Sequence, residues 1–524
     1  MAKASPGLAW WCVPLVLCVA LLAPLTIADL PPLLDYPNHL ARLFVLASLP
    51  GDPILSQFYR THWSIIPNLA LDLVVPPLLV VFPVHIVGRC VIGVALLLPV
   101  AGAIAYHRAL SGRLSYWPLA SVLFAYNAAS LRGFLNFIIS IGFALLFAAA
   151  WVAWRERKPA RAIAVASIGA VVLFFSHLTG LLFFAIMLGA YELDWLRTAS
   201  FRIGALARRF AAGALVFIAP AVLYAASDLG QTQGQAVFRS VAGKLNAALF
   251  PVINYLLPLD IATAFFCIVI VVICLRRRWC AIPFQAAVTI GILVFLFIAL
   301  PHGFKGTWDL DTRFIIMAAF AASASIVPVA VPPRTGRIIG IAFLLLFGAR
   351  MTVLTTVWER WTADLAGFRA VIASVRPGNV VLTVRLRPED ERAAWTHLAS
   401  PRRLSDGTIT DIHLPALLLL EHRAWWPFLF TTRSQQPLET REPFETIAER
   451  VDESYDPIAR LAWHAGEMRL FTHVLVTGQP PGPGLIATEG LTRVAGNDTA
   501  VLFAVDPVAV YAPPWHNPRP RTVP

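Results

Sequence analysis

Charged residues are scarce in this chain of 524 residues. Asp, Glu, Lys and Arg together make up 14% of it and hydrophobic residues 58%, whereas a soluble domain carries about 25% charged residues. This composition excludes an ordinary soluble enzyme. Residues 1–356 contain repeated apolar runs of about twenty residues, the length that crosses a bilayer core of about 30 Å, and residues 360–524 contain none. The sequence therefore predicts a membrane part followed by a soluble part.

Acidic residues are fewer than basic ones, 30 against 42, which leaves a net charge of +12. Such an excess can indicate a nucleic-acid partner. Here, however, the cations lie in short loops between apolar runs, where the positive-inside rule explains them better. We therefore exclude nucleic acid and predict membrane lipids as partners. The sequence identifies no protein partner.

Cysteine is also rare, and all six cysteines lie at or before position 280, in or beside apolar runs. The C-terminal third therefore has no disulfide. It also lacks a phosphate-binding glycine motif and a Cys/His cluster at metal-ligand spacing. The sequence predicts no metal ligand and identifies no cofactor, and it is compatible with a divalent metal without requiring one.

The apolar runs predict about eleven transmembrane helices. The chain is thus expected to be a polytopic α-helical membrane protein, with a transmembrane part at 1–357 and a C-terminal soluble α/β domain at 358–524. The first span is expected to remain as an uncleaved helix, because it is longer than the core of a usual signal peptide. The predicted spans are 8–29, 84–106, 115–131, 133–154, 162–178, 180–194, 208–227, 257–275, 282–300, 314–332 and 338–357.

The charges of the loops give the orientation of these spans. With the N-terminus inside, five loops that hold arginines become cytoplasmic, as the positive-inside rule requires. The first loop (30–83) and the C-terminal domain then lie on the extracytoplasmic side of the inner membrane, the latter as a periplasmic domain. The five basic loops are 107–114, 155–161, 195–207, 276–281 and 333–337.

Two segments need separate interpretation. Residues 66–83 are apolar but contain Asp72 and the Pro76-Pro77 pair, and as a full span they would invert every later loop. We interpret them as a re-entrant or interfacial piece in which Asp72, costly to bury as a charge, faces a cavity. Beyond the last span, a predicted helix at 362–375 precedes short runs typical of an α/β domain. These runs are 379–386, 414–422, 471–478 and 499–505.

The segment after the first span carries the most informative spacing. Asp35, His39 and Arg42 recur at i, i+4 and i+7, which places them on one face of a helix lying in the external interface. A carboxylate there can take a proton from an acceptor hydroxyl, His39 can tune it, and Arg42 can bind a lipid phosphate. The alternative is structural, because Asp35 before Pro37 is also typical of a helix N-cap. The two roles are compatible.

Other polar residues form a second set of candidates for substrate binding. Lys305, Asp309, Asp311 and Arg313 lie in an external loop directly before a predicted span. They can bind a phosphate or its counter-ion, or simply form a solvated loop that anchors the next helix. Inside the bundle, His177, Asn136 and Asp72 mark either function or satisfied interhelical hydrogen bonds.

These features together resemble a known superfamily. A first helix, a long external loop with an acidic residue, about ten further spans and an extracytoplasmic C-terminal domain are similar to the GT-C superfamily of membrane glycosyltransferases, which use polyprenyl-phosphate sugars. The resemblance covers mainly residues 1–356 and rests on architecture. The first loop departs from the common pattern, because it has no paired acidic residues.

The resemblance implies the roles of individual residues. Asp35 would be the catalytic base that deprotonates the acceptor hydroxyl, with His39 beside it. Arg313, together with Lys305 and Arg42, would stabilise the departing lipid phosphate. The reaction would be an inverting transfer from a polyprenyl-phosphate-linked sugar to an envelope glycan, lipid or protein on the extracytoplasmic face.

Two other classes of function stay open at this point. One is a transporter or flippase for a lipid-linked or anionic substrate, for which His177, Asn136 and Asp72 would line a path through the bundle. The other is a non-catalytic scaffold in envelope assembly. The transferase is favoured because six polar candidates fall on one predicted side of the membrane: Asp35, His39, Arg42, Asp309, Asp311 and Arg313.

Overall fold

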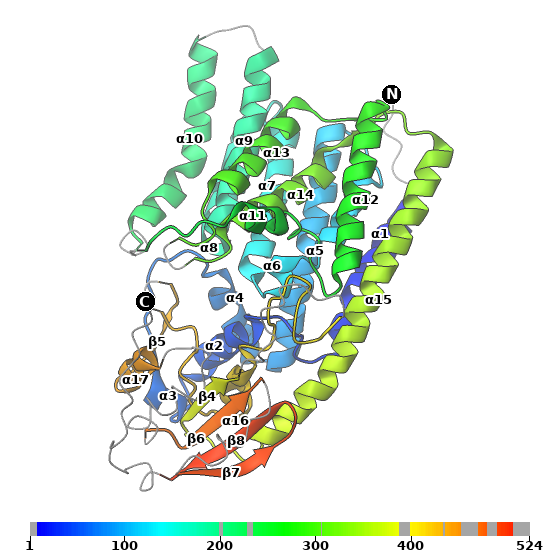
Figure 1. Ribbon diagram of the computed structural model, residues 1–524. Coiled ribbons are helices and arrows are strands. Elements are labelled where there is room, and N and C mark those ends of the chain that lie inside the picture. The colour runs from blue at the N-terminus through cyan, green and yellow to red at the C-terminus, as the bar shows by residue number, and fades with distance from the viewer. Residues whose placement is uncertain are drawn as a thin grey trace, which may run out of the picture.

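The computed structural model describes residues 8–198, 203–227, 234–304, 307–386, 399–432, 435–451, 470–478 and 490–506. Figure 1 shows a bundle of long helices with a strand-containing C-terminal part at one end, and the N-terminus lies at the other end. The expected polytopic helical membrane fold is therefore confirmed.

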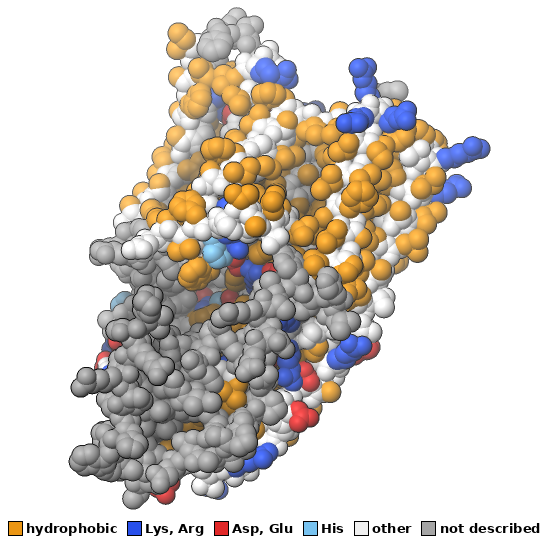
Figure 2. All heavy atoms as spheres, viewed as in Figure 1, with side chains coloured by type: hydrophobic (Ala, Val, Ile, Leu, Met, Phe, Trp, Pro, Cys, Tyr) orange, Lys and Arg blue, Asp and Glu red, His pale blue; other side chains and the backbone are white. Residues whose placement is uncertain are grey.

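Among the described residues, seven helices are long and apolar enough to cross a membrane. They are α5 (Val84–Ser111), α7 (Leu135–Trp154), α8 (Pro159–Ser176), α9 (Leu178–Thr198), α10 (Ile203–Ala225), α12 (Leu257–Arg276) and α15 (Pro333–Ile372). Shorter helices lie in three more predicted spans: α1 (Leu8–Leu22) with η1 (Ala23–Thr26), α13 (Phe284–Ala299) and α14 (Leu310–Ser325). The last of these spans was expected to reach residue 332, but α14 ends at Ser325. Figure 2 shows apolar side chains covering this bundle, with Lys and Arg at the end away from the C-terminal part.

One predicted span is not a regular helix. Residues 115–131 form η2 (Trp117–Phe124), a 3₁₀ helix, and the short α6 (Ala128–Leu131). Asn127 separates them, because its side chain accepts hydrogen bonds from the backbone of Ala129 and Ser130 and thereby starts a new helix. The irregular backbone is tolerated because most of the segment is buried within the protein.

The last span is longer than expected. Residues 338–357 and 362–375 were predicted as a span and a separate helix, and the structure joins them in α15, which has 40 residues. At 1.5 Å per residue, this helix is about 60 Å long, roughly twice the bilayer core. Figure 1 shows it running along the whole molecule into the C-terminal part. The polar residues after position 358 mark an exit from the membrane and not the end of the helix.

The segment 66–83 does not cross the membrane as a helix. It forms α4 (Ala70–Leu79), whose ten residues span only about 15 Å. The helix is thus too short to cross a bilayer core, and its place as an interfacial or re-entrant piece stays a prediction. The side chains of Val74, Val80 and Val81 are exposed, so this segment presents an apolar surface outward.

The C-terminal part contains a mixed sheet in the order β4-β6-β8-β7. Strand β4 (Val381–Arg385) is parallel to β6 (His473–Thr477), and β8 (Ala500–Val505) is antiparallel to β6 and to β7 (Leu491–Gly496). Three predicted runs are thus strands, whereas 414–422 forms η5 (Leu414–Ala416) and α16 (Leu417–His422). The sheet and these helices support the predicted α/β character.

The loop 30–83 packs into the C-terminal part. It contains α2 (Tyr36–Ser48), α3 (Leu55–Phe58) and β1 (Tyr59–Thr61), and β1 pairs antiparallel with β5 (Leu438–Thr440). The ring of Phe58 contacts the rings of Trp425 and Phe444. Phe444 is the first residue of α17 (Phe444–Arg450). The loop and the C-terminal part therefore share one apolar core.

The remaining elements are short. A two-stranded sheet joins β2 (Cys280–Ala281) to β3 (Val327–Pro328) in the loops at the basic end, and α11 (Val241–Ala247) lies between α10 and α12 in the chain.

Candidate active site

Asp35 occupies the N-cap position of α2, and Pro37 follows in the first turn. The position is thus the one expected for a cap, but its side chain makes no capping hydrogen bond. Instead, Oδ1 lies 3.3 Å from Nε2 of His413, a residue of the C-terminal part. The carboxylate is partly accessible, with a side-chain exposure of 17%. The carboxylate is therefore free of a capping hydrogen bond and accessible to a substrate.

His413 is a residue that sequence reasoning missed. It precedes η5 in the C-terminal part, far from Asp35 along the chain, and no local spacing links the two. Only the packing of α2 against α16 and η5 brings them together.

Arg42 and Asp72 form a buried ion pair. Nε and Nη2 of Arg42 donate to the two carboxylate oxygens of Asp72 at 2.9 and 3.1 Å, and both residues are less than 5% exposed. The structure differs from two expectations, that Arg42 meets a lipid phosphate and that Asp72 faces a cavity. The physical reason is that each buried charge satisfies the other, so the pair fixes α4 against α2.

We expect Arg42→Met to destabilise the protein by about 3–5 kcal/mol, because it leaves a buried carboxylate unpaired. The double variant Arg42→Met, Asp72→Leu removes both charges and should regain most of the lost thermal stability. Thermal unfolding of the purified protein in detergent measures both. A double variant as unstable as the single one would show that the pair contributes more than mutual neutralisation.

His39 lies beside Arg42, on the same face of α2, as the spacing predicts. Nη1 of Arg42 lies 3.2 Å from Nδ1 of His39. Because a guanidinium only donates, Nδ1 must accept, and the proton of the neutral ring is on Nε2. Burial, and then the charge of Arg42, lower the pKa of His39 well below its usual range. His39 is therefore neutral at physiological pH.

Asp309 and Asp311 are surrounded by the cations of the chain itself. Arg132 pairs with Asp309, Arg239 contacts both carboxylates at 2.7 and 3.2 Å, and Lys244 lies 2.8 Å from Asp311. Burial raises the pKa of Asp309, but the charges of Arg132 and Arg239 outweigh it and hold this pKa below its usual range. These carboxylates are thus occupied.

This network also reaches the C-terminal part. Nη2 of Arg132 lies 2.6 Å from Asp406 and donates to Thr408 at 2.7 Å. Asp309 and Asp311, predicted to bind substrate, therefore connect the bundle to the C-terminal part. Lys305, the third residue predicted from this loop, lies outside the described residues.

Arg313 differs from the other buried arginines. Four of them have carboxylate partners at 2.6–2.9 Å, namely Arg42, Arg132, Arg155 and Arg350. Arg313 has no ion pair among the residues that the structure describes, and its Nε has no hydrogen-bond partner there. Its guanidinium lies over Phe134 at 5.5 Å and Phe137 at 5.7 Å.

His177 faces Arg313. Nη1 of Arg313 lies 2.8 Å from Nε2 of His177 and, because a guanidinium only donates, Nε2 accepts. The proton of the neutral ring is then on Nδ1, which lies 2.8 Å from Oγ1 of Thr179. His177 thus orients the guanidinium of Arg313 at the start of α14 without neutralising its charge.

Asn136 has a local role in the structure. Its Nδ2 donates to the carbonyl oxygen of Asn68 at 2.8 Å, which ties the start of α7 to the entry of α4. Asn68 itself has a φ of 68°, a conformation that asparagine tolerates better than most residues.

The segment 132–137 contacts both Asp35 and Arg313, the two main candidates for the active site. The backbone N–H of Asp35 donates to the carbonyl oxygen of Arg132 at 3.0 Å, while Phe134 and Phe137 lie under Arg313. Gly133, with a φ of 84°, permits this approach, since a Cβ there would lie 2.8 Å from the backbone nitrogen of Tyr36.

Comparison with known proteins gives one structural match and no sequence match. No protein-family model matches the chain, and no curated protein matches its sequence. Among solved structures, the crystal structure of ArnT from Cupriavidus metallidurans bound to undecaprenyl phosphate matches with a TM-score of 0.53 and 13% identity. The match covers 95% of this chain and 99% of that chain. The chain has the GT-C fold.

In this fold, three residues of the candidate site lie at helix ends on the same side of the bundle. Asn136 follows the start of α7, His177 follows the end of α8, and Arg313 lies in the first turn of α14. Since successive spans alternate in direction, these ends share one side of the bundle, next to the loop that holds Asp35. Figure 2 shows side chains of both charges around a hollow between the bundle and the C-terminal part.

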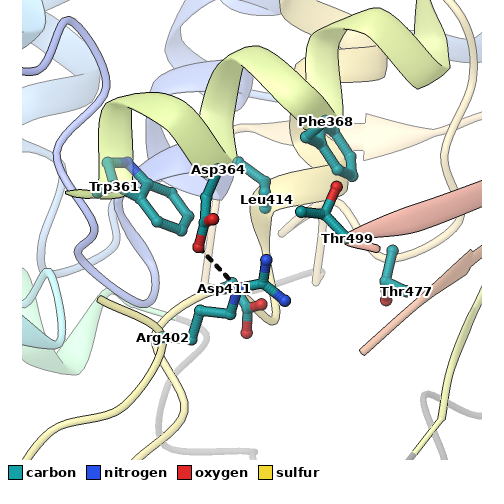
Figure 3. Close-up of a pocket in the computed structure, with 8 residues that line it drawn as sticks. All are labelled: Trp361, Asp364, Phe368, Arg402, Asp411, Leu414, Thr477 and Thr499. Atoms are coloured by element: carbon teal, nitrogen blue, oxygen red, sulfur yellow. Dashed lines mark hydrogen bonds and ion pairs between the residues drawn. The ribbon is translucent and has the colours of Figure 1, made fainter. Parts of the chain in front are cut away.

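A separate pocket lies in the C-terminal part, between α15 and the sheet (Figure 3). Its charged groups have ion-pair partners, since Arg402 lies 2.9 Å from Asp364 and Asp411 lies 2.8 Å from Arg385 outside the pocket lining. Neither Asp35 nor Arg313 lines it, so it is not the candidate active site. Its lining residues are Trp361, Asp364, Phe368, Arg402, Asp411, Leu414, Thr477 and Thr499. Among the described residues, no group of three or more Asp, Glu, His or Cys is placed to hold a metal ion.

Proposed function

We propose that this protein is a membrane glycosyltransferase. It transfers a sugar from a polyprenyl-phosphate donor to an envelope glycan, lipid or protein, with inversion, and Asp35 is the general base. The observation that carries the proposal is Arg313, a buried guanidinium without a carboxylate partner among the described residues, close to the loop that holds Asp35. The likeness to a structure bound to undecaprenyl phosphate supports the donor class.

The arrangement suits a displacement at the anomeric carbon. The acceptor oxygen attacks this carbon as its proton moves to Asp35, and the bond from the carbon to the phosphate oxygen breaks. The departing polyprenyl phosphate carries the developing negative charge. Arg313 stabilises that charge, His177 orients its guanidinium, and the low exposure of Arg313 strengthens the interaction.

The distribution of arginines between the two ends of the bundle supports transfer on the extracytoplasmic side. The loops with clustered arginines lie at the end of the bundle opposite to the C-terminal sheet, in agreement with a cytoplasmic location. The loop of Asp35 and the C-terminal part then lie on the extracytoplasmic face of the inner membrane. The candidate site sits where that face meets the bundle, as a lipid-linked donor requires.

A donor-turnover assay tests this function. The purified protein is placed in liposomes with lipid extract from its own membranes and a panel of polyprenyl-phosphate monosaccharides. We expect one of these donors to be consumed, with release of one free polyprenyl phosphate for each sugar transferred. Movement of intact donor across the bilayer without release of the lipid phosphate would favour a flippase instead.

A further inference from the structure

In the contact between Asp35 and His413, the structure defines which group donates the hydrogen bond. His413 is buried at 7% exposure, and its two ring nitrogens meet two different groups. Nε2 lies 3.3 Å from Oδ1 of Asp35, and Nδ1 lies 3.2 Å from Nδ2 of Asn38. Which nitrogen carries the proton therefore depends on how the amide of Asn38 is oriented.

The backbone around Asn38 fixes that orientation. Oδ1 of Asn38 accepts from the backbone N–H of Phe430 at 2.8 Å, and Nδ2 donates to the carbonyl oxygen of Phe428 at 2.8 Å. Neither contact can be reversed, since a backbone N–H only donates and a carbonyl oxygen only accepts. The second hydrogen of Nδ2 is therefore directed at His413, and Nδ1 of the imidazole must accept it.

The neutral ring of His413 consequently carries its proton on Nε2, the atom that faces Asp35. Aromatic rings hold the imidazole in place: Phe430 lies 5.1 Å and Trp426 lies 6.1 Å from it, centroid to centroid. Asn38 is fully buried. The chain Asn38, His413, Asp35 thus ends in a hydrogen-bond donor aimed at the carboxylate from within a largely apolar surrounding.

We propose that His413 is a positioning residue for Asp35. Its Nε2–H donates to the carboxylate and fixes the direction in which the other oxygen faces the acceptor hydroxyl. Asn38 selects the tautomer that makes this possible. The C-terminal part therefore completes the active site of the membrane part. This role rests on the proposed function of Asp35 as the base.

Two amide substitutions of His413 separate this role from simple packing. The amide nitrogen of a glutamine at this position can reach Asp35, as Nε2 of the histidine does. The shorter asparagine can replace only the contact with Asn38. A distant histidine, His422, which contacts the carbonyl oxygen of Val375, provides a matched control as His422→Gln.

The first readout needs no substrate. Dicyclohexylcarbodiimide modifies protonated carboxyl groups, and mass spectrometry of the peptide containing Asp35 measures the extent at a fixed pH. His413→Asn removes the donor that holds Oδ1 of Asp35 and leaves this oxygen free to react, so we expect modification of Asp35 to rise by about tenfold. His413→Gln should rise much less, and His422→Gln should match the original protein. Equal modification in His413→Asn and the original protein would overturn the proposal.

The second readout is sugar transfer from the donor identified in the turnover assay. His413→Asn should lower kcat by about tenfold or more with little change in KM, and His413→Gln should recover part of the loss. Equal kcat values for the two amides would contradict a positioning role. If instead Asp35→Asn retains transfer while the modification results hold, the assigned base fails and the contact with His413 stands.

Discussion

Asp35→Asn lowers kcat for sugar transfer by about 10²–10⁴-fold, the usual contribution of a general base. The amide cannot take the proton of the acceptor hydroxyl. The fold should persist, because the carboxylate makes no capping hydrogen bond and asparagine is itself a good N-cap residue. Release of polyprenyl phosphate from the donor, together with the thermal unfolding temperature, measures both effects.

Asp29→Asn is the matched control for this variant. Asp29 precedes the same helix and pairs with Arg369 at 2.8 Å, but its carboxylate is 40% exposed and far more open to solvent than Asp35. We expect its loss to change kcat less than twofold. Turnover by Asp35→Asn at the level of Asp29→Asn would remove Asp35 as the base.

On the proposed function, we expect Arg313→Leu to weaken the binding of undecaprenyl phosphate by about 10–100-fold, since a hydrogen bond to a charged group contributes about 1.5–3 kcal/mol. The leucine keeps the contact with Phe134 and Phe137 but removes the charge that lacks a carboxylate partner among the described residues. Arg313→Lys should lose less, because it keeps the charge but not the planar fork. Titration of the protein in nanodiscs with undecaprenyl phosphate, followed by native mass spectrometry, gives the Kd values.

Arg337→Gln controls for a general effect of positive charge on an anionic lipid. Arg337 is exposed and lies near the start of α15, at the end of the bundle opposite to the candidate site. Its Kd should match that of the original protein. An unchanged Kd in Arg313→Leu would show that the phosphate binds elsewhere.

The sequence predicts the bundle well because the signal for a span is local. A run of apolar residues long enough to cross the bilayer is visible in any window of the chain, and loop arginines give its direction. The prediction fails where a different local signal competes. Asn127 breaks 115–131 by capping a new helix inside buried surroundings, and α15 continues through polar residues that resemble a loop.

The candidate site could be predicted only in part, for the same reason. Helical spacing correctly places His39 and Arg42 on one face, because i, i+3 and i+4 neighbours follow from helix geometry. The partners of these residues come from distant segments, as with Asp72 for Arg42 and His413 for Asp35. Such pairs depend on the packing of α2 against α4 and the C-terminal part, which no local pattern encodes.

The charged loop before α14 shows this limit most clearly. Asp309, Asp311 and Arg313 look equivalent in the sequence as phosphate or counter-ion ligands. In the structure, the two carboxylates are neutralised by Arg132, Arg239 and Lys244, while Arg313 turns to His177. Of these three residues, only Arg313 has no ion-pair partner among the residues that the structure describes, and the three-dimensional arrangement alone distinguishes it.

The central claim is that Asp35 and Arg313 face one site for a polyprenyl-phosphate donor. A cryo-electron microscopy structure of the protein in nanodiscs with undecaprenyl phosphate tests it most directly. We predict phosphate density against the guanidinium of Arg313, with the carboxylate of Asp35 facing the same cavity. Phosphate density on another surface, with Arg313 unoccupied, would contradict the proposed active site.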